Sequence, residues 1–343
     1  MNRREVTLKD IAQRCNTSVP TVSYVISGSK KRYVNQELRD RIIACAEEMN
    51  YVPRKRRGYT DGLRALAVVI PQSENVFFRR MIHGMESVAY ERGFLPAVYH
   101  TGDIADRETV ILEHLSKQQY QGFLLVPSER SQISTEMLGK LRRPFVVAER
   151  PMPCEGWFDF FSMDNYHAGY EATQALIRAG HRHIGLITWI NSAVTLLDRH
   201  VGYARALEEV GIQYRPEYVQ MGQFSVEDGR RMTRELLSAQ PELTALLYAY
   251  HVPAQGGIEF MRSMGIRIPD DISVVVAGDP TWVEMCTPSF THVTLPSFEV
   301  GRQAITALID RIEKKLDGSP RRVTIKGTLV KGGSVKSLNG MDR

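Results

Sequence analysis

The chain has 343 residues, 43% of them hydrophobic and 24% charged, with a formal net charge of +5. This composition is ordinary for a globular protein of two or three domains. No run approaches the roughly 18 apolar residues of a membrane span, and the first ten residues lack the apolar stretch of a signal peptide, so we expect a cytoplasmic protein without membrane contact. The four cysteines show no C-x-x-C spacing, which argues against a zinc site or a disulfide framework.

The positive charge is concentrated in the first part of the chain. Residues 1–65 hold 14 Lys and Arg against 7 Asp and Glu, a net charge of +7. Subtraction from the totals of 44 and 39 leaves 30 against 32, a net charge of −2, for the other 278 residues. A basic head on a near-neutral body is typical of a phosphate-binding module, although a merely solvated basic face is the alternative.

Residues 7–28, TLKDIAQRCNTSVPTVSYVISG, predict two short helices joined by a turn. Apolar residues recur at helical spacing in the first helix, which Thr7 caps, and Asn16 suits the left-handed backbone of a tight turn. Ser18 caps the second helix, Pro20 fits its first turn, and Gly28 closes it. Such pairs occur in many all-α domains, but the charge favours DNA binding. The candidate contacts are the two caps and the outer side of the second helix: Thr7, Ser18, Val19, Pro20, Thr21, Ser23 and Tyr24.

A third helix is predicted over residues 35–49, with Asn35 as its cap and an inward stripe of Leu38, Ile42, Cys45 and Met49. We therefore expect a DNA-binding domain over residues 1–52. Residues 53–65 are basic and glycine-containing, which indicates a linker. Its cations are candidate phosphate contacts: Arg54, Lys55, Arg56 and Arg57.

From Leu66 onward, short apolar runs alternate with helical patterns. The runs are LAVVIP, FLPAVYH, GFLLVP and FVVAER, followed after Ser162 by HIGLIT, YVQMG, ALLYAY and ISVVVAG. Strands that are apolar at every position are buried on both faces, which predicts parallel sheets covered by helices. The repeated rhythm predicts two similar α/β lobes.

These segments resemble the LacI/GalR family of bacterial transcription regulators. Residues 7–28, Tyr33-Val34, the helix over 35–49 and Asn50-Tyr51-Val52-Pro53 resemble its helix-turn-helix head-piece, and residues 68–335 resemble its periplasmic-binding-protein-like core. The specific marks are GHRHIG at 180–185, IPDDISVV at 268–275, TP at 287–288 and THVTLP at 291–296. The two histidines of GHRHIG lie between a helix and a strand, which favours a turn with a glycine cap over a metal site.

The resemblance implies an all-α head-piece followed by a two-lobed α/β core of parallel sheets, residues 66–335, with three chain crossings near 162–164, 290–293 and 320–323. The N-lobe is then expected at 66–162 plus 293–321, the C-lobe at 163–291 plus 322–335, and a tail at 336–343. The ligand should lie between the lobes, where strands end.

The resemblance also implies effector contacts at Phe77, Phe78, Asp164, Thr195, Arg199, Phe224 and Asp279. Aromatic faces would cover a ring, and Arg199 would act only on the ligand, with core packing and a helix-start salt bridge as the respective alternatives. The chain departs from the family at Tyr250-His251, where Asn-Asp is common, and at Gly278-Asp279, where Asp-Asp is common. Fewer cleft carboxylates beside Arg199 would suit an anionic ligand, although His251 can equally be structural.

The linker departs from the family too. Members usually carry a short helix with a leucine that enters the minor groove, whereas this chain has Gly58 and Gly62 around a run of cations. We therefore expect residues 54–57 to act as a charged arm and Leu63 to belong to the edge of the core.

Taken together, the resemblance implies a sequence-specific DNA-binding transcription repressor. We expect a homodimer on a pseudo-palindromic operator, controlled by a sugar, sugar acid or sugar phosphate. No G-x-S-x-G, H-E-x-x-H, Walker or G-x-G-x-x-G motif is found, so neither an enzyme nor a cofactor or metal is expected. The alternative is a solute-binding or sugar-modifying protein, which would have no use for a DNA-binding head. The tail lacks heptads, so no coiled-coil tetramer is expected.

Overall fold

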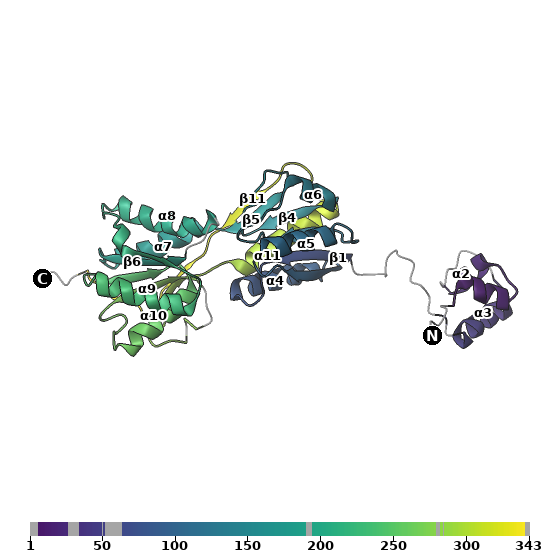
Figure 1. The fold of residues 1–343 in the computed structure, drawn as a ribbon, viewed down its shortest axis with the longest axis horizontal. Coiled ribbons are helices and arrows are strands. Elements are labelled where there is room, and N and C mark those ends of the chain that lie inside the picture. Colours follow the sequence, from purple (N-terminus) through teal and green to yellow (C-terminus); the bar gives the residue numbers. More distant parts are fainter. Residues whose placement is uncertain are drawn as a thin grey trace. The chain divides into compact units, whose positions relative to one another are not determined.

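The computed structural model describes residues 6–26, 34–49, 51, 64–189, 194–278, 282–283 and 285–339, with the backbone alone for 194–196. The chain forms two compact units, Met1–Gly62 and Leu63–Arg343, shown in Figure 1. Each unit has its own hydrophobic core. Among the described residues, no helix is long and apolar enough to cross a membrane.

The first unit contains the three predicted helices, α1 (Leu8–Arg14), α2 (Val19–Ile26) and α3 (Gln36–Glu48). Ile11, Val22 and Ile42, one from each helix, are fully buried against one another. The predicted turn is confirmed, because Asn16 has a left-handed φ of 48° and the Ser18 hydroxyl accepts from the backbone N–H of Thr21 at 3.3 Å. The predicted cap at Gly28 lies outside the described residues.

The N-lobe of the second unit is a parallel sheet in the order β11-β5-β4-β3-β1-β2. Its strands are β1 (Arg64–Ile70), β2 (Phe94–His100), β3 (Phe123–Leu125), β4 (Phe145–Ala148), β5 (Asp159–Met163) and β11 (Arg322–Ile325). Its helices are α4 (Val76–Ala89), α5 (Ala105–Leu115), α6 (Thr135–Leu141) and α11 (Ser297–Ile312). Alternate residues of β1 belong to two different clusters, Val68 to one and Val69 to the other, so this apolar strand is buried on both faces as predicted.

The C-lobe sheet has the order β12-β10-β9-β8-β6-β7. Its strands are β6 (Ile184–Trp189), β7 (Val219–Gly222), β8 (Ala245–Tyr248), β9 (Ser273–Ala277), β10 (Thr291–Val293) and β12 (Leu329–Val330), and among the described pairs only β12 with β10 is antiparallel. Its helices are α7 (Asn165–Arg178), α8 (Val194–Glu209), the short η1 (Pro216–Tyr218), α9 (Val226–Ala239) and α10 (His251–Ser263). The α7–α8 and α9–α10 pairs pack together on this sheet.

The chain crosses between the lobes at Asp164, at residues 294–296 and at residues 326–328. The first crossing lies where we predicted it, but the other two come a few residues later. Residues 322–325 form β11, which pairs with β5 in the N-lobe sheet, so their predicted place in the C-lobe is wrong. Val293 likewise stays in the C-lobe sheet as the end of β10. β10 ends opposite the end of β9, at Ala277, and β11 ends opposite the end of β5, at Met163. The chain leaves each sheet only after that pairing is complete, and the partner of β11 is distant in sequence.

The GHRHIG segment is the predicted turn between α7 and β6. Gly180 has a φ of 96°, in the left-handed region that glycine tolerates. Buried His181 is hydrogen-bonded to the Thr244 hydroxyl at 2.9 Å and to the Lys336 carbonyl at 3.1 Å. Burial lowers the pKa of His181, which favours a neutral structural imidazole.

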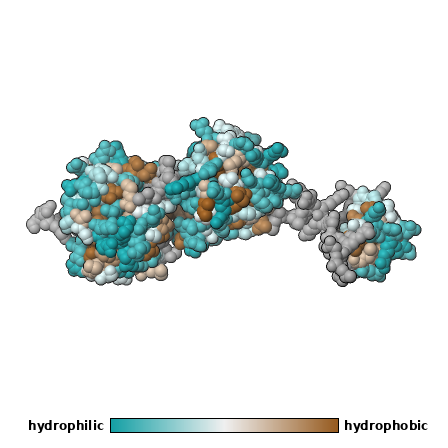
Figure 2. Space-filling view, viewed as in Figure 1, coloured by the Kyte–Doolittle hydropathy of each residue, from teal (hydrophilic) through white to brown (hydrophobic). Residues whose placement is uncertain are grey.

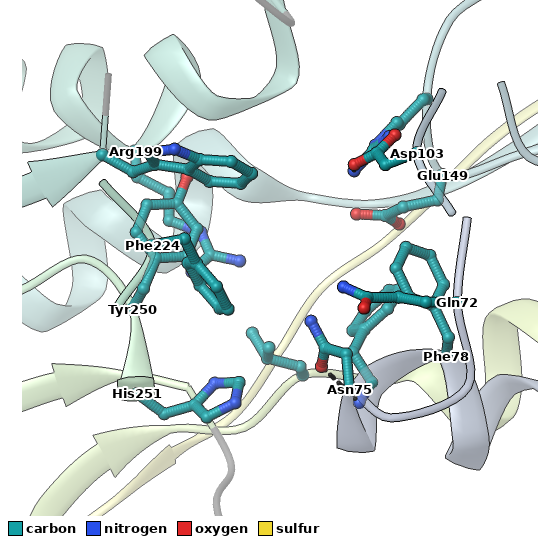
Figure 3. Close-up of a pocket in the computed structure, with 13 residues that line it drawn as sticks. Gln72, Asn75, Phe78, Asp103, Glu149, Arg199, Phe224, Tyr250 and His251 are labelled. Carbon is teal, nitrogen blue, oxygen red and sulfur yellow. Dashed lines mark hydrogen bonds and ion pairs between the residues drawn. The ribbon is translucent and has the colours of Figure 1, made fainter. Parts of the chain in front are cut away.

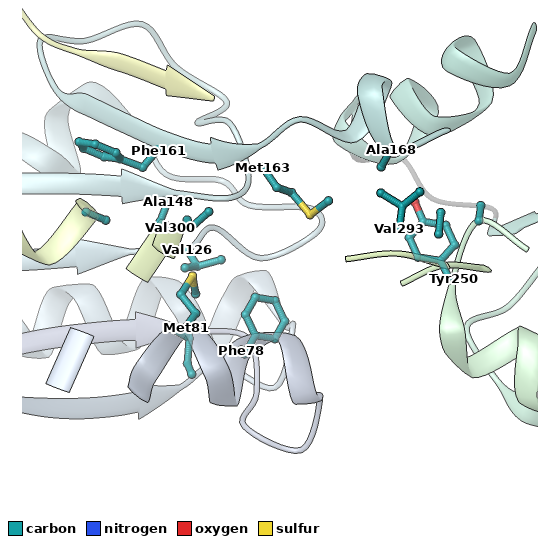
Figure 4. Packing of buried hydrophobic residues seen from close by; sticks show 14 of the residues in the cluster. Phe78, Met81, Val126, Ala148, Phe161, Met163, Ala168, Tyr250, Val293 and Val300 are labelled. Atoms are coloured by element: carbon teal, nitrogen blue, oxygen red, sulfur yellow. The ribbon is translucent and has the colours of Figure 1, made fainter. Parts of the chain in front are cut away.

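Buried apolar residues continue from one lobe into the other. Figure 4 shows Phe78, Met81 and Phe161 in the N-lobe, with Met163 at the first crossing and Val293 and Tyr250 in the C-lobe. On the face shown in Figure 2, apolar residues lie in small scattered groups on a largely hydrophilic surface. Most apolar side chains therefore lie in the cores and in the contact between the lobes.

Candidate functional site: a DNA-contact helix and an interlobe pocket

Helix α2 presents its candidate DNA contacts away from the core of the first unit. Val22 and Val25 are buried, whereas Val19 is 40% exposed. Ser18 and Pro20 are exposed, and Thr21, Ser23 and Tyr24 are half-buried. Thr7 is exposed at the start of α1, where the Asp10 carboxylate accepts from its backbone N–H at 2.7 Å. The accessible side of α2 thus carries the side chains predicted to contact DNA, while Arg54, Lys55, Arg56 and Arg57 lie outside the described residues.

A pocket opens between the two lobes of the core, with an empty volume of about 640 Å³ that includes space open to solvent. Figure 3 shows Arg199, Phe224, Tyr250 and His251 on one side and Gln72, Asn75, Phe78, Asp103 and Glu149 on the other. Phe77, Arg150, Trp189 and Leu295 complete the lining. Concave sites with apolar walls and a few polar groups are typical of small-molecule binding.

Four of the predicted effector residues line this pocket: Phe77, Phe78, Arg199 and Phe224. Asp164 is not among the lining residues. Its carboxylate instead accepts from the backbone N–H of His167 at 2.7 Å and caps helix α7. The side chain of Thr195 and the whole of Asp279 lie outside the described residues.

Sequence reasoning missed the residues that follow β2, β4 and β10. Asp103 comes from the first of these segments, Glu149 and Arg150 from the second, and Leu295 from the third. The sequence shows both strand-like runs, FLPAVYH and FVVAER, so the rule that ligands bind beyond the carboxyl ends of strands points to Asp103 and Glu149. The expectation that few carboxylates lie beside Arg199 is wrong, because these two line the same pocket.

The C-lobe wall of the pocket is aromatic. The rings of Trp189 and Phe224 have centroids 5.0 Å apart, and Tyr250 meets Trp189 edge-on at 6.0 Å. The ring of His251 meets Phe224 edge-on at 5.9 Å. Tyr250 is 5% exposed, and burial raises its pKa to about 12, so the phenol stays protonated. Such a wall offers flat faces to the C–H groups of a sugar or to another ring.

Arg199 is 4% exposed and is held mainly by the protein itself. Its Nε donates to Oδ1 of Asn165 at 2.8 Å, and its Nη1 donates to the carbonyls of Ala277, at 3.0 Å, and Ala249. No carboxylate within ion-pair distance is found among the described residues, so the alternative of a helix-start salt bridge is not supported. The expectation that Arg199 acts only on ligand is wrong, because the same guanidinium joins the ends of β8 and β9.

Glu149 connects the pocket to the first crossing. Its backbone adopts a left-handed φ of 63°, and its Oε2 accepts from the backbone N–H of Met163 at 3.3 Å. Figure 3 shows its carboxylate pointing into the space between the lobes. Burial raises the pKa of Glu149 to about 7, although Met163, Arg199 and Arg150 oppose that rise. A group poised near neutrality in a ligand pocket is typical of functional sites.

Asp103 and Arg150 neutralise each other on the N-lobe side. Nη1 of Arg150 donates to Oδ1 of Asp103 at 2.6 Å and Nη2 donates to Oδ2 at 3.0 Å, a bidentate pair. Asp103 also accepts from the backbone N–H of Glu129 at 2.8 Å. The pair is therefore fixed in place. The Glu149 carboxylate and the Gln72 amide can adapt to a ligand, whereas the Asn75 oxygen caps α4 by accepting from the backbone N–H of Phe77 at 2.9 Å.

Comparison with known proteins gives the same division of the chain. Residues 7–54 match the family described as bacterial regulatory proteins, lacI family. Residues 173–335 match the periplasmic binding protein-like domain. The HTH-type transcriptional repressor PurR of Haemophilus influenzae is 31% identical over 339 residues, which cover 97% of this chain and 99% of that protein. PurR of Serratia proteamaculans is 30% identical over 316 residues, covering 91% and 92%.

Solved structures agree over most of the chain. A complex of the transcriptional regulator CelR with cellobiose superposes with a TM-score of 0.71 at 28% identity, covering 96% of this chain and all of that one. A LacI family transcriptional regulator from Enterococcus faecium with bound ribose gives a TM-score of 0.70 at 26% identity, covering 80% and 100%. With head-piece, core and full-length relatives in agreement, the chain belongs to the lacI family of bacterial regulatory proteins.

Proposed function

We propose that this protein is a transcription repressor whose affinity for operator DNA is set by a small carbohydrate-derived molecule bound between the core lobes. The observation that carries the proposal is the presence, in one chain, of a helix-turn-helix unit and a pocket between two lobes lined by aromatic and polar side chains. The relatives named PurR are repressors, and the related CelR and Enterococcus regulators were solved with cellobiose and ribose. No catalytic group is needed for this role.

DNA recognition is assigned to α2, with Val19, Pro20, Thr21, Ser23 and Tyr24 toward the base edges and Thr7 and Ser18 near the backbone. A helix of eight residues reaches only a few base pairs. Specificity therefore requires two copies, and we propose a homodimer on a pseudo-palindromic operator. The linker cations Arg54, Lys55, Arg56 and Arg57 would add phosphate contacts.

Effector binding is assigned to Phe77, Phe78, Arg199 and Phe224 together with Glu149, Tyr250 and His251. The aromatic wall suits the apolar face of a sugar ring, and the Glu149 carboxylate suits a hydroxyl donor. Asp103 and Arg150 cancel each other. Nε and Nη1 of Arg199 donate to Asn165, Ala249 and Ala277, so only Nη2, which lies 3.7 Å from the Met163 sulfur, can turn to a ligand. Among carbohydrate derivatives, this arrangement favours hydroxyl-rich ligands over dianionic phosphates.

Selection of DNA fragments retained by the purified full-length protein would define the operator. Neutral sugars, sugar acids and sugar phosphates would then be screened for their effect on that binding, with calorimetry to measure direct affinity. We expect one carbohydrate class to bind and to change operator affinity. A protein that retains no specific DNA sequence, or whose operator affinity changes with none of these ligands, would contradict the proposal.

A further inference from the structure

The parallel N-lobe sheet gathers the starts of its strands at one edge. β1 pairs in parallel with β3, β3 with β4, β4 with β5 and β5 with β11, so Arg64, Phe123, Phe145, Asp159 and Arg322 lie along the same side. We call this side the amino edge. Two helices also end at this edge. Helix α6 precedes β4 and is followed by Arg142 and Arg143, and helix α11 precedes β11 and is followed by Lys314. Figure 1 shows the start of β1 at this end of the N-lobe.

Two carboxylates of the amino edge, Asp159 and Glu313, are neutralised by arginines. Asp159 accepts from Arg311 at 3.0 Å through both oxygens, which lowers the pKa of its carboxyl group. Glu313 pairs with Arg64 at 2.7 Å and with Arg92 at 2.6 Å. Glu91 and Asp317 are also exposed at this edge, with no cation within ion-pair distance among the described residues, so they offset part of its positive charge.

Four further cations at this edge are exposed and have no carboxylate within ion-pair distance among the described residues: Arg142, Arg143, Lys314 and Arg322. Arg322 is held over the rings of Phe158, at 5.0 Å, and Phe160, at 5.4 Å. Arg142 and Lys314 adopt left-handed φ values of 51° and 56°, where glycine or asparagine would be less strained. The helix dipole favours cations next to the carboxyl end of a helix, which can account for Arg142 and Lys314. It does not account for Arg143, which lies beyond the end of α6, or for Arg322, which begins strand β11.

The position of these four cations in the chain indicates which partner they can contact. Residues 66–343 carry a net charge of −2, so a local excess of cations stands out from the rest of the core. Only twelve residues, 52–63, separate Tyr51 of the DNA-binding unit from Arg64 at the amino edge. A chain of that length spans less than about 50 Å even when extended, so DNA held by the first unit is always at a high effective concentration near this edge.

We propose that the amino edge is a second DNA-contact surface, which binds phosphates of the same duplex through Arg142, Arg143, Lys314 and Arg322. It adds affinity without sequence readout, because these cations lie outside any groove-reading element and can contact only the phosphate backbone. The inference rests on DNA binding by the helix-turn-helix unit. It assigns to the core a share of the phosphate contacts that the head-piece and linker would otherwise make alone.

The test compares two full-length variants with equal charge loss. One carries Arg142→Gln, Arg143→Gln and Lys314→Gln. The matched control carries Arg182→Gln, Arg234→Gln and Arg262→Gln, three exposed C-lobe cations. Operator affinity is measured between 50 and 300 mM salt, about the range in which phosphate contacts dominate. Melting temperatures verify that both variants remain folded.

We expect the amino-edge variant to bind the operator about tenfold more weakly at low salt, with a salt slope lowered by up to about three per protomer, while its base preference is unchanged. The control should match the wild type. Hydroxyl-radical footprints should lose protected positions only in the amino-edge variant. Equal salt slopes and footprints for both variants would overturn the inference, while a wild-type protein that binds no operator would instead overturn the proposed function.

Discussion

The guanidinium carbon of Arg199 lies 4.3 Å from the ring centroid of Tyr250, so the cation is stacked on a residue of the pocket wall. Through Nη1 the same side chain donates to the carbonyl of Ala249, which follows β8, and to the carbonyl of Ala277, which ends the neighbouring strand β9. Ligand binding and the packing of the C-lobe therefore share one side chain. Any change of Arg199 should affect both, because buried carbonyls left without donors are costly.

Replacing Arg199 by Ala should weaken effector binding about ten- to a hundredfold, the loss of a charge-assisted contact worth about 1.5–3 kcal/mol. It should also lower the free energy of unfolding by a similar amount, because the carbonyls of Ala249 and Ala277 lose their donor. Calorimetry with the effector and thermal melting without it measure the two effects. Arg199→Lys, which keeps the charge but not the planar fork, should recover part of the stability. An unchanged melting temperature for Arg199→Ala would show that the carbonyl contacts contribute nothing.

Glu149 should make the stability of the core depend on pH. Its pKa is about 7 in the folded protein, against a usual value near 4.5, so between these values the folded state holds a proton that the unfolded state has released. The contribution of Glu149 to the free energy of unfolding is therefore fully present at low pH. It falls by roughly 3 kcal/mol in total as the pH rises from about 4.5 to 7.

Glu149→Gln, which cannot ionise, should remove that loss. Denaturant unfolding of both proteins at pH 5, 6, 7 and 8 should show the stability difference, variant minus wild type, increasing with pH across this window. The difference between the proteins isolates Glu149 from other titrating groups. A constant difference at all four pH values would mean that Glu149 titrates near its ordinary pKa.

Tyr24 stands where many family members carry an arginine that contacts a base edge. A phenol can donate one hydrogen bond or lie against a thymine methyl group, but it cannot form the two parallel bonds that select guanine. Operators of the wild type should therefore lack a strong guanine preference at this position, and Tyr24→Arg should create one. Selection of binding sites from a random library with both proteins measures this. Identical preferences would place Tyr24 outside the set of base contacts.

The linker prediction rests on the sequence, since residues 52–63 lie outside the described residues. If residues 54–57 form a charged arm, Arg56→Ala combined with Arg57→Ala should weaken binding to all DNA sequences and lower the salt slope by up to about two. Leu63→Ala should barely change operator affinity. A large loss from Leu63→Ala, with a preference for a flexible central CG or TA step, would instead indicate a leucine inserted into the minor groove.

The sequence by itself determined the elements whose stability is local. The spacing that buries Ile11 and Val22 and the side-chain cap of Ser18 act within a few residues, so the helix-turn-helix could be predicted from short-range pattern. The βαβ rhythm in the same way predicted parallel sheets, because strands apolar at every position must be covered on both faces. The resemblance to the LacI/GalR family pointed to four residues that line the pocket, Phe77, Phe78, Arg199 and Phe224.

Only the tertiary structure decided how distant segments share the pocket. Asp103 and Glu149 follow strand ends that the sequence reveals, but which of these ends meet in one pocket depends on the strand order of the sheets. β11 joined the N-lobe because it hydrogen-bonds with β5, where Arg322 pairs with Phe160. The double role of Arg199 depends on the carbonyls of Ala249 and Ala277, 50 and 78 residues away. Backbone carbonyls carry no sequence signature, so which of them point at a buried guanidinium is fixed only when the strands and helices are packed together.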